Sequence, residues 1–482
     1  MQRTGHASPE VKLQAETYVG TGYQRLLTFE VPGGGFSLFG NPPAEVFLTA
    51  YGLMEFNDMA RVYPVDEDLL ERTARWLLDR QAADGTWSEQ GYSEHWQIDA
   101  QAPTTAYIAW ALIEAGYKDR PEVERAIGYL HESTGGTGSA QQKDAYSLAL
   151  VANALAAYDP EDAMTRAAID QLYEMRVQKG DLVYWKTNAA SFMGATGESG
   201  SLETTALAAI ALLQADMHAD AVSGALAYLV QGKDAWGTWS TTQATILSLK
   251  ALLLATEKQG QAAGPAIVHV SLNQEQTQEI AIDQRNADVV HLVTFERGFS
   301  SGGTNRVQIE VEASPGLAGG GNLMYQVATH FYLPWDQVPP TPEMEELIVI
   351  DLLYDRTALA VNDEVTVDVQ VRLNREGVVK MVLIDLGVPP GFTVVAEDLS
   401  RLVEGGVAEE RIARYELTGR QIIVYLEDFS SATPLAFSFR MRARFPMRAQ
   451  TPPSSAYDYY NPTDGTVKAP LQVVVAEQVP GK

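Results

Sequence analysis

The side chains that could do chemistry in this chain are histidines and carboxylates, because cysteine is absent. The 482 residues include seven histidines, 62 acidic residues and no cysteine. Without cysteine, the chain itself can form no disulfide, no thiolate nucleophile and no thiolate-ligated metal site. No histidine stands in the His-Glu-x-x-His spacing that holds zinc on a helix. The sequence therefore predicts no metal site and no cofactor.

Paired carboxylates and a loop histidine remain as candidates for catalysis. Glycosidases use two acidic residues that flank the scissile bond, and a chain so rich in acids leaves such a pair open. His95, in "QGYSEHWQIDAQAPTTAY", falls in a loop between a Gly/Trp turn and the next predicted helix. A neutral imidazole there could act as a nucleophile, although the sequence shows no partner that would orient it.

The charge balance excludes two classes of partner. Acidic residues outnumber the 35 basic ones and give a net charge of -27, which repels nucleic-acid phosphates and anionic lipid surfaces. No run of about 18 apolar residues occurs, and "MQRTGHASPEVKL" lacks the apolar core of a signal peptide. We expect no nucleic-acid binding and no membrane insertion.

The first part of the chain, residues 1–258, is predicted to be helical, and His95 lies in this part. Apolar residues recur at spacings of three and four in segments such as "DEDLLERTARWLLDRQ" and "TTQATILSLKALLLA", which predicts about ten helices. Pairs of these helices alternate with the turns "GGGFSLFG", "DGTW" and "WGTW". Glycine permits positive φ in such turns, and the aromatic side chain can fill the space between helix pairs. The pattern predicts an α/α toroid, a ring of paired helices.

Beyond residue 258 the pattern becomes one of strands, so the fold class is multidomain α plus all-β. Residues 259–335 contain four segments that alternate apolar and polar residues, which predicts a small β-sheet. These segments are "AIVHVSLNQEQTQEIAID", "ADVVHLVTFERG", "NRVQIEVEAS" and "LMYQVATHFYLPW". A proline-rich, acidic linker follows at 336–346. Residues 347–482 then predict a β-sandwich with one inserted helix, "AEDLSRLVEGG".

Several of these segments resemble one protein family. "SPEVKLQAETYVGTGYQRLLTFEVPGGGFSLFG", "FLTAYGLMEFNDMARVY" and "WSTTQATILSLKALL" are similar to the thioester-containing domain of the α2-macroglobulin and complement family. "MVLIDLGVPPGFTV", "QIIVYLEDF" and "AYDYYNPTDG" resemble that family's C-terminal receptor-binding domain. The resemblance implies that the small sheet is the second half of a CUB-type domain, into which the toroid is inserted.

The family's reactive centre is absent from this chain. The family's thioester joins Cys and Gln within a Cys-Gly-Glu-Gln motif, upstream of the matching stretch. The pairs Glu89-Gln90, Glu275-Gln276 and Glu477-Gln478 have no cysteine beside them. Two ring helices, the first half of the CUB sheet and the protease bait region would also precede Met1. Two interpretations stay open, a C-terminal portion of a larger protein or a complete product that lost the chemistry. The first is favoured because an open ring would expose apolar faces.

The resemblance assigns roles to positions that this chain fills differently. In complement-type members a histidine near the place of His95 attacks the thioester, but the loop here is shorter. Vertebrate members present two receptor-binding lysines at positions that correspond to Ala396 and Ser400. Neither residue supplies an ammonium group, so that interaction is not expected. Arg401 stands among Glu397, Asp398 and Glu404, and we expect it to form a helix-surface salt bridge.

The expected function is that of the C-terminal part of a broad-spectrum endopeptidase inhibitor, not an enzyme. The partners implied are target endopeptidases, reached through the intact protein, and its upstream macroglobulin domains. An extracellular or periplasmic location follows from the same resemblance. Two alternatives come from other classes of protein: a toroid enzyme of terpene cyclase or glycosidase type with an accessory sandwich, and an adhesion or binding module.

Overall fold

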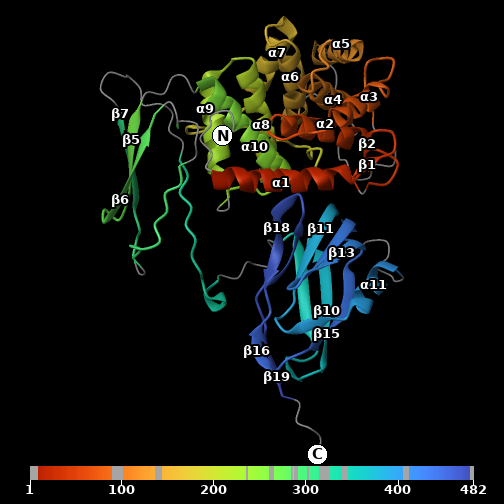
Figure 1. Ribbon diagram of the computed structural model, residues 1–482, viewed down its shortest axis with the longest axis vertical. Coiled ribbons are helices and arrows are strands. Elements are labelled where there is room, and N and C mark those ends of the chain that lie inside the picture. The colour runs from red at the N-terminus through yellow and green to blue at the C-terminus, as the bar shows by residue number, and fades with distance from the viewer. Residues whose placement is uncertain are drawn as a thin grey trace, which may run out of the picture. The chain divides into compact units, whose positions relative to one another are not determined.

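A computed structural model describes most of the chain as two compact units. The described residues are 9–38, 40–88, 101–135, 144–234, 237–259, 265–283, 286, 291–300, 303–313, 325–338, 346–404 and 412–477. The first unit comprises Met1–Ser191, Gly200–Lys233 and Gln243–Val327. The second comprises Phe192–Ser199, Asp234–Thr242 and Ala328–Lys482. Helices dominate the first unit and strands the second (Figure 1).

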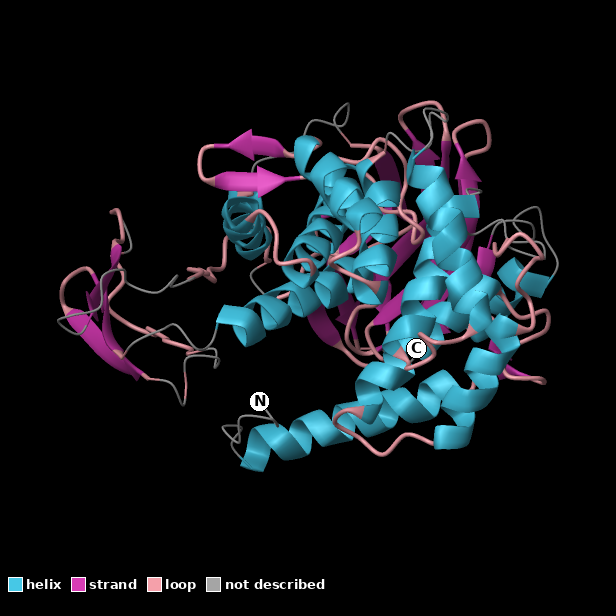
Figure 2. Ribbon diagram, turned by 90° about the horizontal axis from the view of Figure 1, so that it is seen from above, coloured by secondary structure: helices cyan, strands magenta, loops and turns pink. Residues whose placement is uncertain are grey.

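The described part of the chain contains ten helices before residue 260, as the sequence pattern predicts. They are α1 (Pro9–Leu27), α2 (Val46–Ala60), α3 (Glu67–Leu78), α4 (Gln101–Glu114), α5 (Pro121–Gly135), α6 (Ala145–Tyr158), α7 (Ala163–Glu174), α8 (Gly197–Gln214), α9 (Ala219–Gln231) and α10 (Thr242–Gln259). They appear as the cyan coils of Figure 2. α4 and α6 are buried along most of their length, whereas α3 and α7 bury one stripe. This difference separates an inner from an outer layer, as in the expected toroid.

The Gly/aromatic turns join the two layers by a repeated set of contacts. One short hairpin, β1 (Glu30–Val31) with β2 (Gly35–Phe36), lies at the first of these turns, and a second, β3 (Val177–Lys179) with β4 (Leu182–Tyr184), lies in "VQKGDLVYW", which likewise contains a glycine and ends in a tryptophan. The backbone N–H groups of Phe36, Trp87 and Trp185 donate to the hydroxyls of Thr49, Thr105 and Thr205 at 2.9, 3.2 and 3.0 Å. The indoles of Trp87 and Trp185 donate to the carbonyls of Leu77 and Leu172, at the ends of the preceding outer helices.

The small sheet has three strands in its described part, which corrects the expected four. β5 (Ala266–Leu272) pairs antiparallel with β6 (Gln276–Ile282) on one side and β7 (Val307–Ala313) on the other. The first predicted strand is therefore a hairpin. The described parts of the second and fourth predicted strands, 291–298 and 325–335, form no strand, apart from the first residue of a short 3-10 helix, η2 (Trp335–Gln337). Alternation favours an extended chain there, but no strand in the described ranges pairs with these segments.

The second unit contains the predicted β-sandwich with its inserted helix, α11 (Ala396–Glu404). The strands are β8 (Ile348–Tyr354), β9 (Ala358–Ala360), β10 (Glu364–Leu373), β11 (Val378–Gly387), β12 (Phe392–Val394), β13 (Ile412–Leu417), β14 (Gln421–Ser430), β15 (Leu435–Ala443), β16 (Met447–Gln450), β17 (Ser454–Asp458), β18 (Asn461–Lys468) and β19 (Gln472–Ala476). One sheet has the order β12-β15-β10-β8 and the other β13-β14-β11-β17-β18, while β16-β19-β9 forms a third, small sheet.

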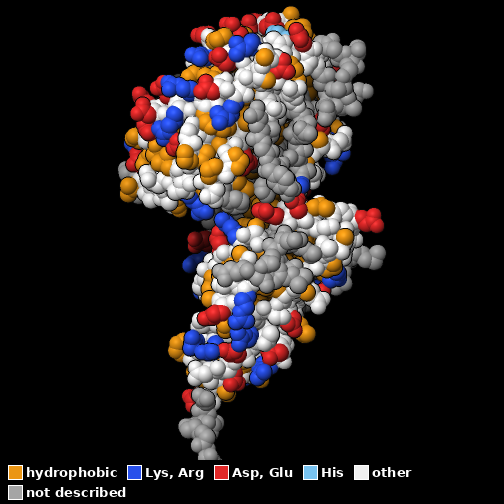
Figure 3. All heavy atoms as spheres, turned by 90° about the vertical axis from the view of Figure 1, so that its right-hand side faces the viewer, with side chains coloured by type: hydrophobic (Ala, Val, Ile, Leu, Met, Phe, Trp, Pro, Cys, Tyr) orange, Lys and Arg blue, Asp and Glu red, His pale blue; other side chains and the backbone are white. Residues whose placement is uncertain are grey.

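Alternation along β10 shows how the sandwich core is built. Val365, Val367, Val369 and Val371 are fully buried, and they pack in one cluster with Phe439 and Met441 of β15 and with Ile384 of β11. The residues between them, Thr366, Asp368 and Gln370, are polar and lie on the opposite face of the strand. On the face shown in Figure 3, basic and acidic side chains of the sandwich lie next to one another.

Candidate functional sites

A polar stripe runs along α2 in the helical unit. Tyr51, Glu55 and Asp58 are spaced by four and three residues, which places them on one face of the helix, and we call them the α2 stripe. Lys250 of α10 reaches this stripe and pairs with Asp58, with 2.5 Å between Nζ and Oδ2. Glu203 of α8 is fully buried and lies close enough to act electrostatically on Tyr51. Three inner helices thus contribute to one charged cluster.

Burial dominates the electrostatics of the α2 stripe. Loss of solvent raises the pKa of Glu55; the positive charge of Lys250 opposes that rise and the charge of Asp58 adds to it. Burial likewise raises the pKa of Tyr51, and the nearby charges of Glu55 and Glu203 raise it further. Among the described residues, neither the Glu55 carboxylate nor the Tyr51 hydroxyl has a hydrogen-bond partner. The stripe is therefore half-buried, and its unpaired polar atoms still reach solvent.

This cluster does not have the geometry that a glycosidase needs. Glu55 and Asp58 lie about one turn apart on the same helix face, whereas catalytic carboxylates approach a sugar from two sides. The Glu203 side chain is fully buried and so is closed to a substrate. In the described ranges, no group of three or more metal-ligating side chains is arranged to hold a metal ion. None of the described helices is long and apolar enough to cross a membrane.

The predicted receptor positions lie on α11 in the second unit. Ala396 and Arg401 are exposed, and the Ser400 hydroxyl lies 3.3 Å from the Tyr415 hydroxyl of β13. Leu399 is fully buried and anchors the helix in the sandwich core. Neither Ala396 nor Ser400 presents a cation. Their role in binding stays a prediction.

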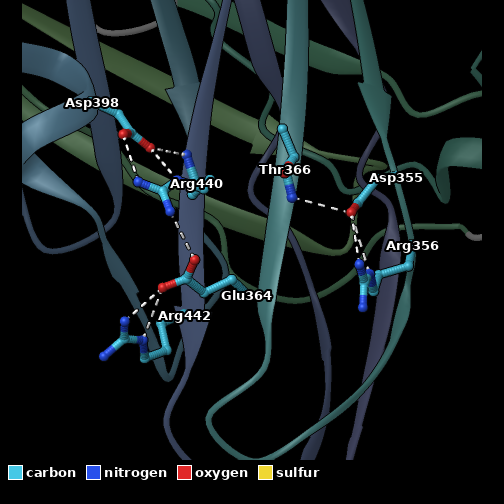
Figure 4. A network of polar contacts seen from close by, with 7 residues as sticks. All are labelled: Asp355, Arg356, Glu364, Thr366, Asp398, Arg440 and Arg442. Carbon is cyan, nitrogen blue, oxygen red and sulfur yellow. Dashed lines mark hydrogen bonds and ion pairs between the residues drawn. The ribbon is translucent and has the colours of Figure 1, made fainter. Parts of the chain in front are cut away.

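Asp398 fixes α11 to the sheet through Arg440 of β15 (Figure 4). Its two carboxylate oxygens accept from Arg440 Nε, Nη2 and the backbone N–H at 2.9, 2.9 and 3.0 Å. The hydrogen bonds from Arg440 hold the pKa of Asp398 below its usual value, and the charge of Arg401 has a smaller effect in the same direction. The main partner of Asp398 is thus Arg440 and not Arg401. Sequence distance hid this contact, because 42 residues separate the two partners. The expected salt bridge of Arg401 stays a prediction, because the side chain of Glu404 lies outside the described residues.

The same network continues along the sheet surface. Arg440 Nη1 also donates to Glu364 of β10 at 3.1 Å, and Arg442 donates to the other oxygen of Glu364 at 2.6 Å. Arg442 is the main cause of a lowered pKa at Glu364. Nearby, Asp355 accepts from the Thr366 backbone N–H and from the Arg356 guanidinium. In Figure 4, Asp398, Arg440, Glu364 and Arg442 form a chain of alternating charges, and Asp355 with its two partners forms a separate group.

The stretch "AYDYYNPTDG" forms the hairpin β17–β18, as its strand-and-turn pattern predicts. Asp458 and Asn461 are buried at the turn, where the Asn461 amide donates to Asp458 Oδ2 at 2.8 Å. The side-chain Oδ1 of Asn461 accepts from the Thr196 backbone N–H at 2.9 Å, within the second unit. Burial raises the pKa of Asp458. The turn therefore holds a desolvated carboxyl that organises its backbone.

Sequence reasoning singled out His95 and missed the α2 stripe. His95 lies outside the described residues, so its role also stays a prediction. The overlooked signal was a lone charge in an apolar helical run: Lys250 in "TILSLKALLLA", and Glu55 and Asp58 in "FLTAYGLMEFNDMA". Charges in such runs are expected to be paired when the helix is buried on all sides.

Comparison with family models identifies two conserved domain types in this chain. A model described as the A-macroglobulin TED domain matches residues 1–254. A second, described as the A-macroglobulin receptor binding domain, matches residues 377–469. A similar curated protein is ovostatin of Gallus gallus, 22% identical over 487 residues. That alignment covers 95% of this chain and 31% of ovostatin, so the chain spans about a third of that relative's length.

Solved structures show the same fold. A crystal structure of native α2-macroglobulin from Escherichia coli, spanning domain MG7 to the C-terminus, has a TM-score of 0.61 at 16% identity. The match covers 98% of this chain and 70% of that one. A cryo-EM reconstruction of the native E. coli protein gives a TM-score of 0.62 at 17% identity, covering 98% of this chain and 28% of that one. At these identities the likeness concerns the fold alone.

Proposed function

Because the chain belongs to the α2-macroglobulin family, we propose that it is the C-terminal part of a broad-spectrum endopeptidase inhibitor, a protease trap. The observation that carries this proposal is the order of the matched domains, with a TED-type region at 1–254 and a receptor-binding type at 377–469. In this proposal the target endopeptidases meet the intact protein, and the present chain performs no chemistry of its own. Its work is extracellular or periplasmic.

The proposed domain plan follows the secondary structure. We assign 1–258 to a thioester-domain-like toroid, 259–335 to half of a CUB-type domain, 336–346 to a linker and 347–482 to a receptor-binding-like sandwich. The exposed apolar side chains of the CUB segment support its incompleteness. Leu292, Tyr325, Val327, Phe331 and Tyr332 are all exposed in segments that pair with no strand among the described residues. Such side chains favour pairing with further strands.

The ring also has faces that suit an additional helix. Leu13 and Tyr18 on α1 are exposed, as are Leu249 and Leu253 on α10. Leu249 and Leu253 are four residues apart and share one face of α10, whereas Leu13 and Tyr18 are five apart and point to different sides of α1. Exposed apolar side chains that gather on one face are normally covered. We propose that an upstream segment of the same protein covers them and brings the thioester motif that this chain lacks.

The receptor-binding-like sandwich is proposed to keep the family fold without the family's lysine pair. Ala396 and Ser400 occupy the corresponding positions, and Arg401 is the cation nearest to them in the sequence. His95 is proposed as a residue near the thioester in the intact protein. Both assignments depend on the upstream segment being present.

The decisive experiment extends the chain to its natural upstream sequence. The extended protein is mixed with trypsin and assayed with a large protein substrate and with a small chromogenic peptide. A trap blocks cleavage of the large substrate but leaves cleavage of the small one unchanged, because the protease stays active inside it. With the present chain as the matched control, trypsin should cleave both substrates. Full cleavage of the large substrate by trypsin mixed with the extended protein would refute the proposal.

A further inference from the structure

The surface where α2 meets α10 has one feature that the proposed function leaves unexplained. We call this surface the α2–α10 seam and define it by Glu55, Asp58, Lys250, Leu249 and Leu253. The Lys250–Asp58 ion pair joins the two helices, so the α2 stripe and the exposed leucines of α10 lie beside the same contact. Leu253 is 60% exposed, although it stands one turn from that ion pair.

The charges of the seam do not balance. Two carboxylates, Glu55 and Asp58, face one ammonium group, and that ammonium group is bound to Asp58 at 2.5 Å. A carboxylate that loses its water when a partner covers it costs free energy unless a cation or several hydrogen-bond donors compensate it. Glu55 is half-buried and has no such donor among the described residues, so a partner that covers it would have to supply one. The seam is one cation short.

The apolar part of the seam indicates the shape of what covers it. Leu249 and Leu253 are four residues apart, which is the spacing of one helix face. The 18 residues of α10 span about 27 Å, so a helix of similar length could lie along it. The relatives that match this chain are longer than it, and in the proposed function an upstream segment of the same protein supplies that helix.

We infer that the helix covering the α2–α10 seam comes from the preceding part of the same protein and carries a lysine or arginine that pairs with Glu55. This inference rests on the proposed function, because it takes the ring to be completed by an upstream segment. It adds a specific chemical requirement, an apolar face for Leu249 and Leu253 with one cation on its edge. A cation there would complete two carboxylate–cation pairs in place of one.

The test uses synthetic 18-residue amphipathic helical peptides with the full chain as it is. All share one Leu/Ala face, and a single lysine occupies one of four central positions in turn. A glutamine peptide matches each lysine peptide. Binding is measured by fluorescence anisotropy, and circular dichroism verifies that each protein variant keeps the wild-type fold.

At one lysine position we expect binding about tenfold tighter than that of the matched glutamine peptide. The Glu55→Gln variant should lose this advantage, and Glu55→Lys should prefer a peptide with glutamate at that position. Glu124→Gln, which removes an exposed acid from α5, is the matched control and should keep the advantage. In the wild-type protein, raising the salt concentration should weaken the lysine peptide more than its glutamine partner.

The outcomes separate the two proposals. If the peptides bind but lysine gives no advantage at any position, the cation requirement is wrong, and the proposal that a helix covers the seam is kept. An advantage that survives in Glu55→Gln would also overturn the requirement. If none of the peptides binds, the seam is not a helix-docking surface, and the proposed completion of the ring fails with it.

Discussion

At the scale of single residues, the charged groups of this chain follow two opposite rules. Asp398 is a carboxylate kept charged, because Arg440 donates to both of its oxygens. Glu55 is a carboxylate driven toward its neutral form, because burial outweighs the charge of Lys250. The first stabilises the fold at neutral pH, and the second weakens it there.

Removing the Asp398 carboxylate should loosen α11. We expect Asp398→Ala to lower the free energy of unfolding of the sandwich by about 1 to 2 kcal/mol, because three hydrogen bonds to Arg440 are lost. Urea unfolding and hydrogen exchange of the α11 amides would measure the effect. Glu397→Ala, an exposed neighbour, is the control and should change neither.

The same pair predicts a pH dependence. Since the pKa of Asp398 is lowered in the folded state, its contribution is present above the unfolded pKa near 3.8 and is lost as the pH falls through the folded value. The stability gap between the wild type and Asp398→Asn should therefore shrink in acid. A gap that widened as the pH fell below 4 would contradict this assignment.

Glu55 should show the reverse trend. Its folded pKa is raised, so its contribution is present below the unfolded pKa near 4.5 and is lost as the pH rises through the folded value. The melting temperature of Glu55→Gln should be a few degrees higher than that of the wild type at pH 8, and the difference should fade toward pH 4. Equal melting curves across this range would show that Glu55 is solvated.

At the scale of elements, the ring depends on turns that bring glycine against the backbone of a neighbouring helix. Gly34 and Gly85 have φ of +96° and +85°. A Cβ at Gly34 would lie 2.9 Å from the Arg72 carbonyl oxygen, and one at Gly85 would lie 2.7 Å from that of Arg125. The same turn therefore packs in the same way on two successive outer helices, α3 and α5.

Two glycine substitutions separate backbone strain from steric overlap. Gly116→Ala meets a φ of +90° with no atom within 4 Å of the added Cβ, so about 1 to 2 kcal/mol of left-handed strain is expected. Gly85→Ala has a similar φ and adds the close approach to Arg125. Its loss of unfolding free energy, measured with urea, should be the larger. Equal losses would mean that the turn shifts to accommodate the methyl group.

The elements also show how far the sequence alone reaches. The helices of 1–258 and the long strands β10, β11, β14 and β15 were predictable, because their apolar periods are strong and uninterrupted. Residues 291–298 and 325–334 alternate as strands do, but alternation does not supply a partner strand. The Lys250–Asp58 pair was not predictable either, because periodicity tells which face is apolar and not which helix lies opposite a given charge.

At the scale of the whole molecule, two parts of the chain carry exposed apolar surface of different kinds. The segments that follow the strands of the small sheet expose aromatic side chains, whereas α10 exposes a pair of leucines. Exposed stripes of this type promote association. The present chain should therefore be more prone to self-association than a protein in which these faces are covered.

A single substitution tests this expectation for the helical unit. Leu253→Lys places a charge on the exposed stripe without removing a buried group, so the free energy of unfolding should stay within about 0.5 kcal/mol of the wild-type value. Light scattering at high protein concentration should fall. Leu77→Lys, at a fully buried position, is the contrasting variant and should unfold the ring. Unchanged scattering in Leu253→Lys would assign the association to the small sheet.

The ion pair between Asp58 and Lys250 can form only late in the synthesis of the chain. Translation proceeds at about 5 to 20 residues per second, and Lys250 is synthesised about 190 residues after Asp58. For roughly 10 to 40 seconds, therefore, the nascent chain contains the α2 stripe but not yet the lysine that pairs with Asp58. A cell that makes this protein has to keep a half-finished ring, with its inner apolar faces open, from meeting another one during that interval.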